Sequence, residues 1–154
     1  MNSLQQKFEE LSRIYPPQMR PSLVLPLLQH LQEEKGYLTE DDAHAVAACT
    51  GVPPVQAIEV LTWYTMLYRK PVGRHVIKVC RNIACSLRGA ERMIDYLERT
   101  LGVSVGETTP DGRFTLITVE CLASCGAAPS MQIDDTHHDC LSEASIDRIL
   151  GGIP

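Results

Sequence analysis

The sequence Cys80-Arg-Asn-Ile-Ala-Cys85 closes one apolar, β-branched run of residues, and Cys121-Leu-Ala-Ser-Cys125 closes another. The two runs are His75-Val-Ile-Lys-Val79 and Phe114-Thr-Leu-Ile-Thr-Val119, and both are typical of buried strands. Two strands that each end in a cysteine loop can bring four thiolates together at one end of a sheet. The sequence therefore predicts a metal or redox site built from Cys80, Cys85, Cys121 and Cys125.

The spacing of the four cysteines narrows the chemistry of this site. A [2Fe–2S] cluster needs four thiolate ligands, conventionally two per iron. Structural zinc sites usually take a tighter C-x2-C pair from each side, and thiol–disulfide enzymes carry one C-x-x-C at the start of a helix. The pairs here are C-x4-C and C-x3-C, which favours an iron–sulfur cluster and leaves a zinc-stabilised interaction module as the alternative. A thiol–disulfide enzyme is disfavoured because the sequence has no C-x-x-C.

The residues inside the two cysteine loops suit a buried anionic group. An oxidised two-iron cluster with four thiolates carries a formal charge of about −2, and burying it is costly unless N–H groups point at the sulfurs. Both loops offer free backbone N–H groups, and the side chains of Asn82 and Ser124 are further candidate donors. We expect Ile83 and Leu122 to limit the access of water, which affects the reduction potential.

Composition and charge exclude several other classes of protein. The 154 residues are 44% hydrophobic and 21% charged, which is ordinary for one folded domain or two small units. The net charge of -5 offers no basic surface for nucleic acid. No apolar run approaches the roughly 20 residues that span a bilayer, and residues 1–8 lack the apolar core of a secretory signal. We therefore expect a cytoplasmic chain without direct membrane insertion, whose six cysteines do not form a disulfide framework.

Residues 1–72 are predicted to form a helical bundle. Thr39 followed by Asp42 predicts a capping box, Ser22 is expected to begin the second helix, and Gly36 and Gly51 are expected to end helices. Six Lys and Arg against eight Asp and Glu leave no basic helix face, so we expect a packing or docking module rather than a DNA reader. The apolar stripes are Leu4, Phe8, Leu11 and Ile14 or Tyr15; Val24, Leu27, Leu28 and Leu31; Ala43, Val46 and Ala47; and Val55, Ile58 and Leu61 or Thr62.

Residues 73–154 are predicted to follow the order strand, helix, strand, strand, strand, helix. The elements are a strand at 75–79, a helix with Leu87, Ala90, Ile94, Leu97 and Leu101 on one face, strands at 114–120 and 129–133, a fourth strand containing Cys140-Leu141, and a final helix capped by Ser142. This order fits a small α/β sandwich of the thioredoxin kind. The expected fold class is α+β, with a helical bundle followed by a thioredoxin-like domain.

The remaining candidate groups have structural explanations. Cys49 lies in an apolar helix and is expected to be a buried small hydrophobe. Cys140 is expected to pack or to be exposed without binding metal, and His137-His138 to be solvated. The aromatic stretch from Trp63 to Tyr68 is expected to belong to the core or to an interface.

The chain as a whole resembles the E subunits of bacterial NADH-quinone oxidoreductase, the respiratory complex I. Related diaphorase subunits of NAD-linked hydrogenases and formate dehydrogenases share the pattern. The resemblance implies a helical bundle before a thioredoxin-like domain with one [2Fe–2S] cluster on Cys80, Cys85, Cys121 and Cys125. It rests on Glu33–Leu38, Val60–Met66, Cys80–Ala90, Thr109–Phe114 and Val119–Pro129.

The resemblance also implies partners and a division of labour. A larger subunit is implied to carry FMN and to bind NADH, and the cluster is implied to exchange single electrons with that flavin. This chain has no Gly-rich nucleotide fingerprint, which agrees with a subunit that lacks a complete active site or a catalytic residue of its own. Other hydrophilic-arm subunits are further implied partners, and association with the inner membrane is implied to be peripheral.

Overall fold

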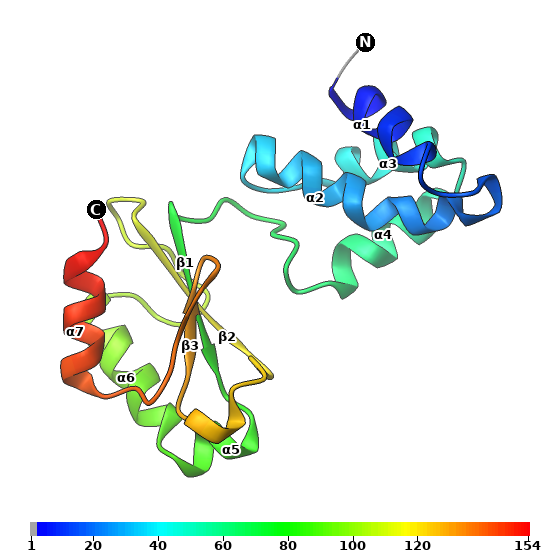
Figure 1. Ribbon diagram of the computed structural model, residues 1–154. Coiled ribbons are helices and arrows are strands. Elements are labelled where there is room, and N and C mark those ends of the chain that lie inside the picture. Colours follow the sequence, from blue (N-terminus) through cyan, green and yellow to red (C-terminus); the bar gives the residue numbers. More distant parts are fainter. Residues whose placement is uncertain (1–2) are drawn as a thin grey trace. The chain divides into compact units, whose positions relative to one another are not determined.

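The computed structural model describes residues 3–154, and the chain divides after Pro71 into two units (Figure 1). Met1 and Asn2, where the predicted bundle and the stretch 1–8 begin, lie outside the described residues. Among the residues that are described, no helix has both the length and the apolar character needed to cross a membrane. Each unit has its own hydrophobic core.

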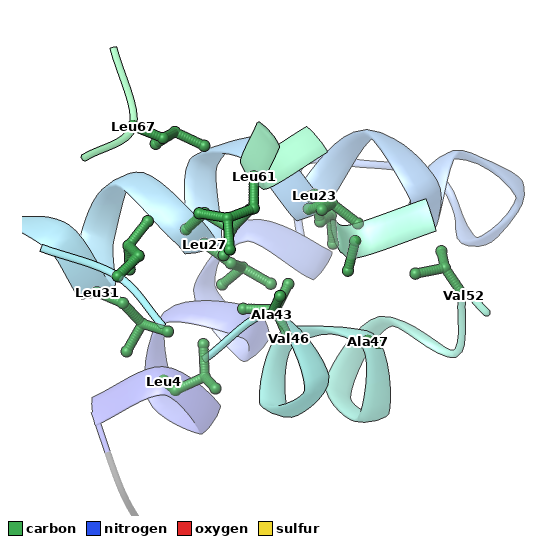
Figure 2. Close-up of a cluster of buried hydrophobic side chains, with 14 residues drawn as sticks. Leu4, Leu23, Leu27, Leu31, Ala43, Val46, Ala47, Val52, Leu61 and Leu67 are labelled. Atoms are coloured by element: carbon green, nitrogen blue, oxygen red, sulfur yellow. The ribbon is translucent and has the colours of Figure 1, made fainter. Parts of the chain in front are cut away.

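The first unit is built from short helices whose apolar stripes face one another. In chain order these are α1 (Ser3–Ser12), the 3-10 helix η1 (Pro17–Leu23), α2 (Val24–Lys35), α3 (Glu40–Thr50) and α4 (Pro54–Trp63). Leu23, Leu27 and Val46 are fully buried, and Figure 2 shows them among the side chains of this core. The stripes are as predicted except at Val55, whose side chain is exposed; of Ile14 and Tyr15, Tyr15 packs against the core and Ile14 is exposed.

The ends of these helices follow the sequence signals in most places. Gly36 and Gly51 end α2 and α3 in the left-handed conformation, where glycine has no steric penalty. Ser22 does not cap α2, because residues 17–23 form a separate 3-10 turn that leads directly into Val24. The N-cap of α2 is therefore Leu23, one residue later than predicted.

The predicted capping box at the start of α3 is confirmed and includes a buried carboxylate. The Thr39 amide donates to Asp42 Oδ2 at 2.9 Å, and the Asp42 amide donates to Thr39 Oγ1 at 3.4 Å. Lys35 forms an ion pair with the same carboxylate. Burial alone raises the pKa of Asp42, but the hydrogen bonds from Lys35 and Thr39 outweigh it and hold the pKa below its usual value.

Asp42→Asn is expected to lower the free energy of unfolding by about 1–2 kcal/mol at pH 7. Because the folded pKa is depressed, the contribution of the carboxylate is complete above the unfolded pKa of about 3.9 and is lost as the pH falls through the folded pKa. Urea unfolding at pH 7 and below pH 4 measures this, with exposed Asp41→Asn as the matched control. A difference between wild type and Asp42→Asn that stays constant with pH would contradict the prediction.

The second unit is a four-stranded sheet with helices packed on it. Its elements are β1 (His75–Cys80), α5 (Ile83–Leu87), α6 (Ala90–Leu101), β2 (Phe114–Val119), the 3-10 turn η2 (Cys125–Ala127), β3 (Met131–Ile133), β4 (Thr136–His138) and α7 (Glu143–Gly152). The strand order is β2-β1-β3-β4, in which β1 and β2 are parallel and the other pairs are antiparallel. Contacts between α6 and α7 and a shared core with the strands complete the α/β sandwich (Figure 1). The predicted α+β fold is confirmed.

Two predicted elements of this unit are wrong. Leu87 does not lie on the buried face of the long helix; it ends the separate helix α5 and is 81% exposed. Gly89, at φ +92°, separates α5 from α6. The fourth strand is Thr136–His138 rather than a segment containing Cys140, because the turn at Asp134-Asp135 pairs Ile133 with Thr136 immediately.

Candidate metal centre

The parallel pairing of β1 and β2 places both cysteine loops at one edge of the sheet. Cys80 is the last residue of β1 and is paired in register with Val119, the last residue of β2. The Arg81 amide donates to the Val119 carbonyl at 3.0 Å and extends this pairing into the first loop. Cys121 follows β2 by two residues, so the two loops begin side by side.

The four predicted site cysteines are all free thiols that interact with one another. The Cys80 thiol interacts electrostatically with those of Cys85 and Cys121, and the Cys125 thiol interacts in the same way with that of Cys121. Cys80 and Cys85 are buried, whereas Cys121 and Cys125 are exposed. Among residues 3–154, no three His, Cys, Asp or Glu side chains are arranged to hold a single metal ion.

Backbone N–H groups surround the sulfur atoms. The Ala123 amide donates to Cys121 Sγ at 3.3 Å. Burial raises the pKa of the Cys80 thiol, but hydrogen bonds from the Asn82 and Leu122 amides and from neighbouring thiols bring the pKa below its usual value. A donor set of four clustered thiols with amides aimed at their sulfurs fits an anionic iron–sulfur cluster.

The other two thiols have raised pKa values, for different reasons. Burial raises the pKa of Cys85, against hydrogen bonds from Ser130 that lower it. The pKa of Cys125 is raised first by its hydrogen bond with Cys121 and then by the charges of the other cysteines. Four thiolates this close repel one another, so a positively charged group such as iron is needed to hold them together as thiolates.

The surroundings of the thiols are closed on one side and open on the other. Cys80 and Cys85 share a small buried cluster with Ala90 and Ala128, against which Leu122 packs. Leu122 therefore shields the site as expected. Ile83 does not, because its side chain is 73% exposed.

Of the polar side chains near the site, one has a different role from the predicted one, and another has a contact that was not predicted. The Asn82 side chain accepts a hydrogen bond from the Ile83 amide at 2.9 Å and caps α5. The backbone amide of Asn82, rather than its side chain, therefore interacts with the Cys80 sulfur. Ser130, which the sequence patterns did not identify, has its hydroxyl 3.6 Å from Cys85 Sγ. The sequence feature that could have identified Ser130 is a small polar residue directly before an apolar strand.

The remaining candidate residues interact with groups other than the four thiols. Cys49 is half-buried in α3, where its thiol donates to Gln5 Oε1 at 3.8 Å. Cys140 is exposed, and its amide donates to the Ala127 carbonyl at 2.8 Å. His137 and His138 lie on the short strand β4. Trp63 is 82% exposed and is not part of the core.

Comparison with known proteins agrees with this geometry. The family model of thioredoxin-like [2Fe–2S] ferredoxins matches residues 8–153. The NADH-quinone oxidoreductase E 2 subunit of Rhizobium meliloti is 40% identical over 148 residues, which is 96% of this chain and 87% of that protein. NADH-quinone oxidoreductase subunit 2 of Thermus thermophilus is 36% identical over 146 residues, covering 94% of this chain and 81% of that protein.

A solved structure shows the same fold at lower sequence identity. The crystal structure of an NAD+-reducing [NiFe]-hydrogenase in the air-oxidized state superposes with a TM-score of 0.70 at 18% identity. The match covers 85% of this chain and 23% of the hydrogenase chain. The resemblance predicted from the cysteine spacing and its flanking residues is confirmed, and the chain belongs to the thioredoxin-like [2Fe–2S] ferredoxin family.

Proposed function

We propose that this chain is the electron-transfer subunit of the NADH-oxidising module of an NADH-quinone oxidoreductase. In this proposal Cys80, Cys85, Cys121 and Cys125 bind one [2Fe–2S] cluster. The observation that carries the proposal is the group of four interacting thiols at one sheet edge, with backbone amides aimed at their sulfurs. The E subunits from other bacteria that share this sequence over most of their length support the same function.

The protein's part in the reaction is to hold a redox centre with little rearrangement. A bound cluster supplies one-electron oxidation and reduction, which suits exchange with a flavin that takes a hydride from NADH. The amides of Asn82, Leu122 and Ala123 offset negative charge on the sulfurs in both redox states. The buried pair Cys80 and Cys85 keeps one side of the site dry, and the exposed pair Cys121 and Cys125 leaves the other side open toward a partner.

The proposed partner is a subunit that carries FMN and binds NADH, together with other subunits of the hydrophilic arm. We place the complex in the cytoplasm, peripherally associated with the inner membrane. Residues 73–154 are proposed as the cluster-binding domain and residues 1–72 as a separate helical domain that takes part in assembly. Exposed apolar side chains beside the proposed ligands, at Ile83 and Leu87, support docking of a protein partner at this edge.

The proposal is tested on the full chain purified anaerobically. We expect about two iron and two sulfide per chain, and a visible absorption that bleaches with dithionite. A colourless protein that binds one zinc and stays colourless after reconstitution with iron and sulfide would instead establish the zinc-stabilised module. Co-purification from the native cell then separates a quinone-linked complex from a diaphorase of a hydrogenase or formate dehydrogenase.

Leu87→Glu is expected to weaken association with the FMN-binding subunit by at least about tenfold, or ~1.4 kcal/mol. The reason is that a charge would replace an apolar side chain on the proposed docking surface without disturbing the core, since Leu87 is already 81% exposed. Cluster content should stay unchanged. Surface plasmon resonance with the purified partner measures the effect, and Val105→Glu, at another exposed position of the same unit, is the control. Equal affinity of both variants would contradict the docking surface.

A further inference from the structure

Ser130 is a fully buried polar residue in contact with one of the proposed cluster ligands. Its relative exposure is 0%, and its hydroxyl oxygen lies 3.6 Å from the sulfur of Cys85, which is 1% exposed. A buried hydroxyl is costly unless it has a hydrogen-bond partner. Because both groups are removed from water, solvent competes little for this contact.

The sheet holds the Ser130 hydroxyl in place. The Ser130 carbonyl accepts a hydrogen bond from the Cys80 amide at 3.1 Å, which ties the residue to the end of β1. The next residue, Met131, begins β3 and pairs with Val79. An interaction with the Ser130 backbone also lowers the pKa of the Cys85 thiol, against the burial that raises it. The sheet pairing of Ser130 therefore places its hydroxyl at this sulfur.

The direction of the hydroxyl bond changes when the cysteine becomes a ligand. In the free protein either the thiol or the hydroxyl can donate. A cluster-bound cysteine is a thiolate and has no proton to give, so only the hydroxyl can donate. The hydrogen bond would then be charge-assisted, and such bonds are stronger than neutral ones.

We propose that the Ser130 hydroxyl donates a hydrogen bond to the Cys85 thiolate of the bound cluster and thereby raises the reduction potential of that cluster. This rests on the proposed function, because it takes Cys85 as a ligand. Reduction adds one electron and breaks no bond, so the negative charge on the sulfurs increases. A donor fixed at a sulfur stabilises the reduced state more than the oxidised state. Ser130 is a positioning residue that acts through Cys85.

Ser130→Ala is expected to lower the equilibrium constant for reduction of the cluster about tenfold, which is ~59 mV for a one-electron couple. The measurement is a redox titration of the full chain, followed by visible absorption and electron paramagnetic resonance. Ser86→Ala is the matched control. Ser86 follows Cys85 directly, but its hydroxyl donates to the Arg81 carbonyl at 3.0 Å and is therefore engaged away from the sulfur.

A second pair of variants separates the hydrogen bond from packing. Ser130→Thr keeps the hydroxyl and Ser130→Val replaces it with a methyl of similar shape, so both add the same volume to the buried site. We expect the Thr variant to have the higher potential, and resonance Raman spectra to show a change in the iron–cysteine stretching bands only in the Ala and Val variants. Full iron content with equal potentials in wild type and Ser130→Ala, or in the Thr and Val variants, would overturn the role of Ser130 and leave the proposed function standing. A wild-type chain without iron would overturn the proposed function itself.

Discussion

Alanine at Cys80, Cys85, Cys121 or Cys125 is expected to reduce the iron content and the visible absorption of the purified chain to near background. Each substitution removes one of four thiolates, and a two-iron cluster with an incomplete ligand set is readily lost. Ligand binding is coupled to folding, since the site does not exist in the unfolded chain, so the second unit should also lose stability of the order of several kcal/mol. Iron analysis and thermal unfolding measure the two effects.

The four variants should differ in the stability of the protein without iron. Cys80 and Cys85 are buried, so their truncation also removes packing against Ala90 and Ala128. Cys121 and Cys125 are exposed, and their loss should cost the apo protein little. Serine substitutions, which retain a weaker oxygen ligand, are expected to recover part of the cluster.

Two cysteines of the same chain serve as controls. Cys49→Ala and Cys140→Ala should keep full iron content, because the Cys49 thiol bonds Gln5 in the first unit, and Cys140 is exposed and bonds the Ala127 carbonyl through its backbone amide. Loss of the visible absorption in either control would show that the proposed ligand set is wrong. Retention of full iron in any of the four variants would have the same consequence.

The sequence predicted the structure best at positions where few residue types can play the structural role. Cysteine pairs at the ends of two apolar runs predicted a shared site, and the parallel register of β1 and β2 brings the thiols together. Thr39 with Asp42, and glycine at 36 and 51, predicted helix ends because capping and positive φ each have few alternative residues.

The sequence was less informative where tertiary contacts decide the outcome. Leu87 has a spacing that suits the face of the following helix, but the turn at Gly89 separates it from that helix and leaves it exposed. The last strand forms at 136–138 because a two-residue turn fixes its register. The strand propensities of His137 and Cys140 do not indicate where this strand lies. Ser130 gains its role only from the pairing of β1 with β3, which no local pattern specifies.

The division into two units predicts that a core truncation destabilises only the unit that contains it. Leu27 in α2 and Ile77 in β1 are both 0% exposed, and they belong to the separate cores of the two units. Truncation of either side chain to alanine removes similar volume and is expected to cost about 2–5 kcal/mol in the unit that contains it. Because the two cores share no buried residue among those described, each loss should stay within its own unit.

Ile77→Ala should therefore release the cluster at a lower urea concentration, whereas Leu27→Ala should leave the cluster's absorption unchanged. Ile77 pairs with Leu116 on one side and Ile133 on the other, so a cavity there loosens the strand that ends at Cys80. Hydrogen exchange followed by mass spectrometry reports each unit separately. Leu27→Ala should accelerate exchange in α2 and α3 while β1 and β2 stay protected. If both substitutions lowered protection throughout the chain and released iron together, the two units would unfold as one, and the helical domain would itself stabilise the cluster.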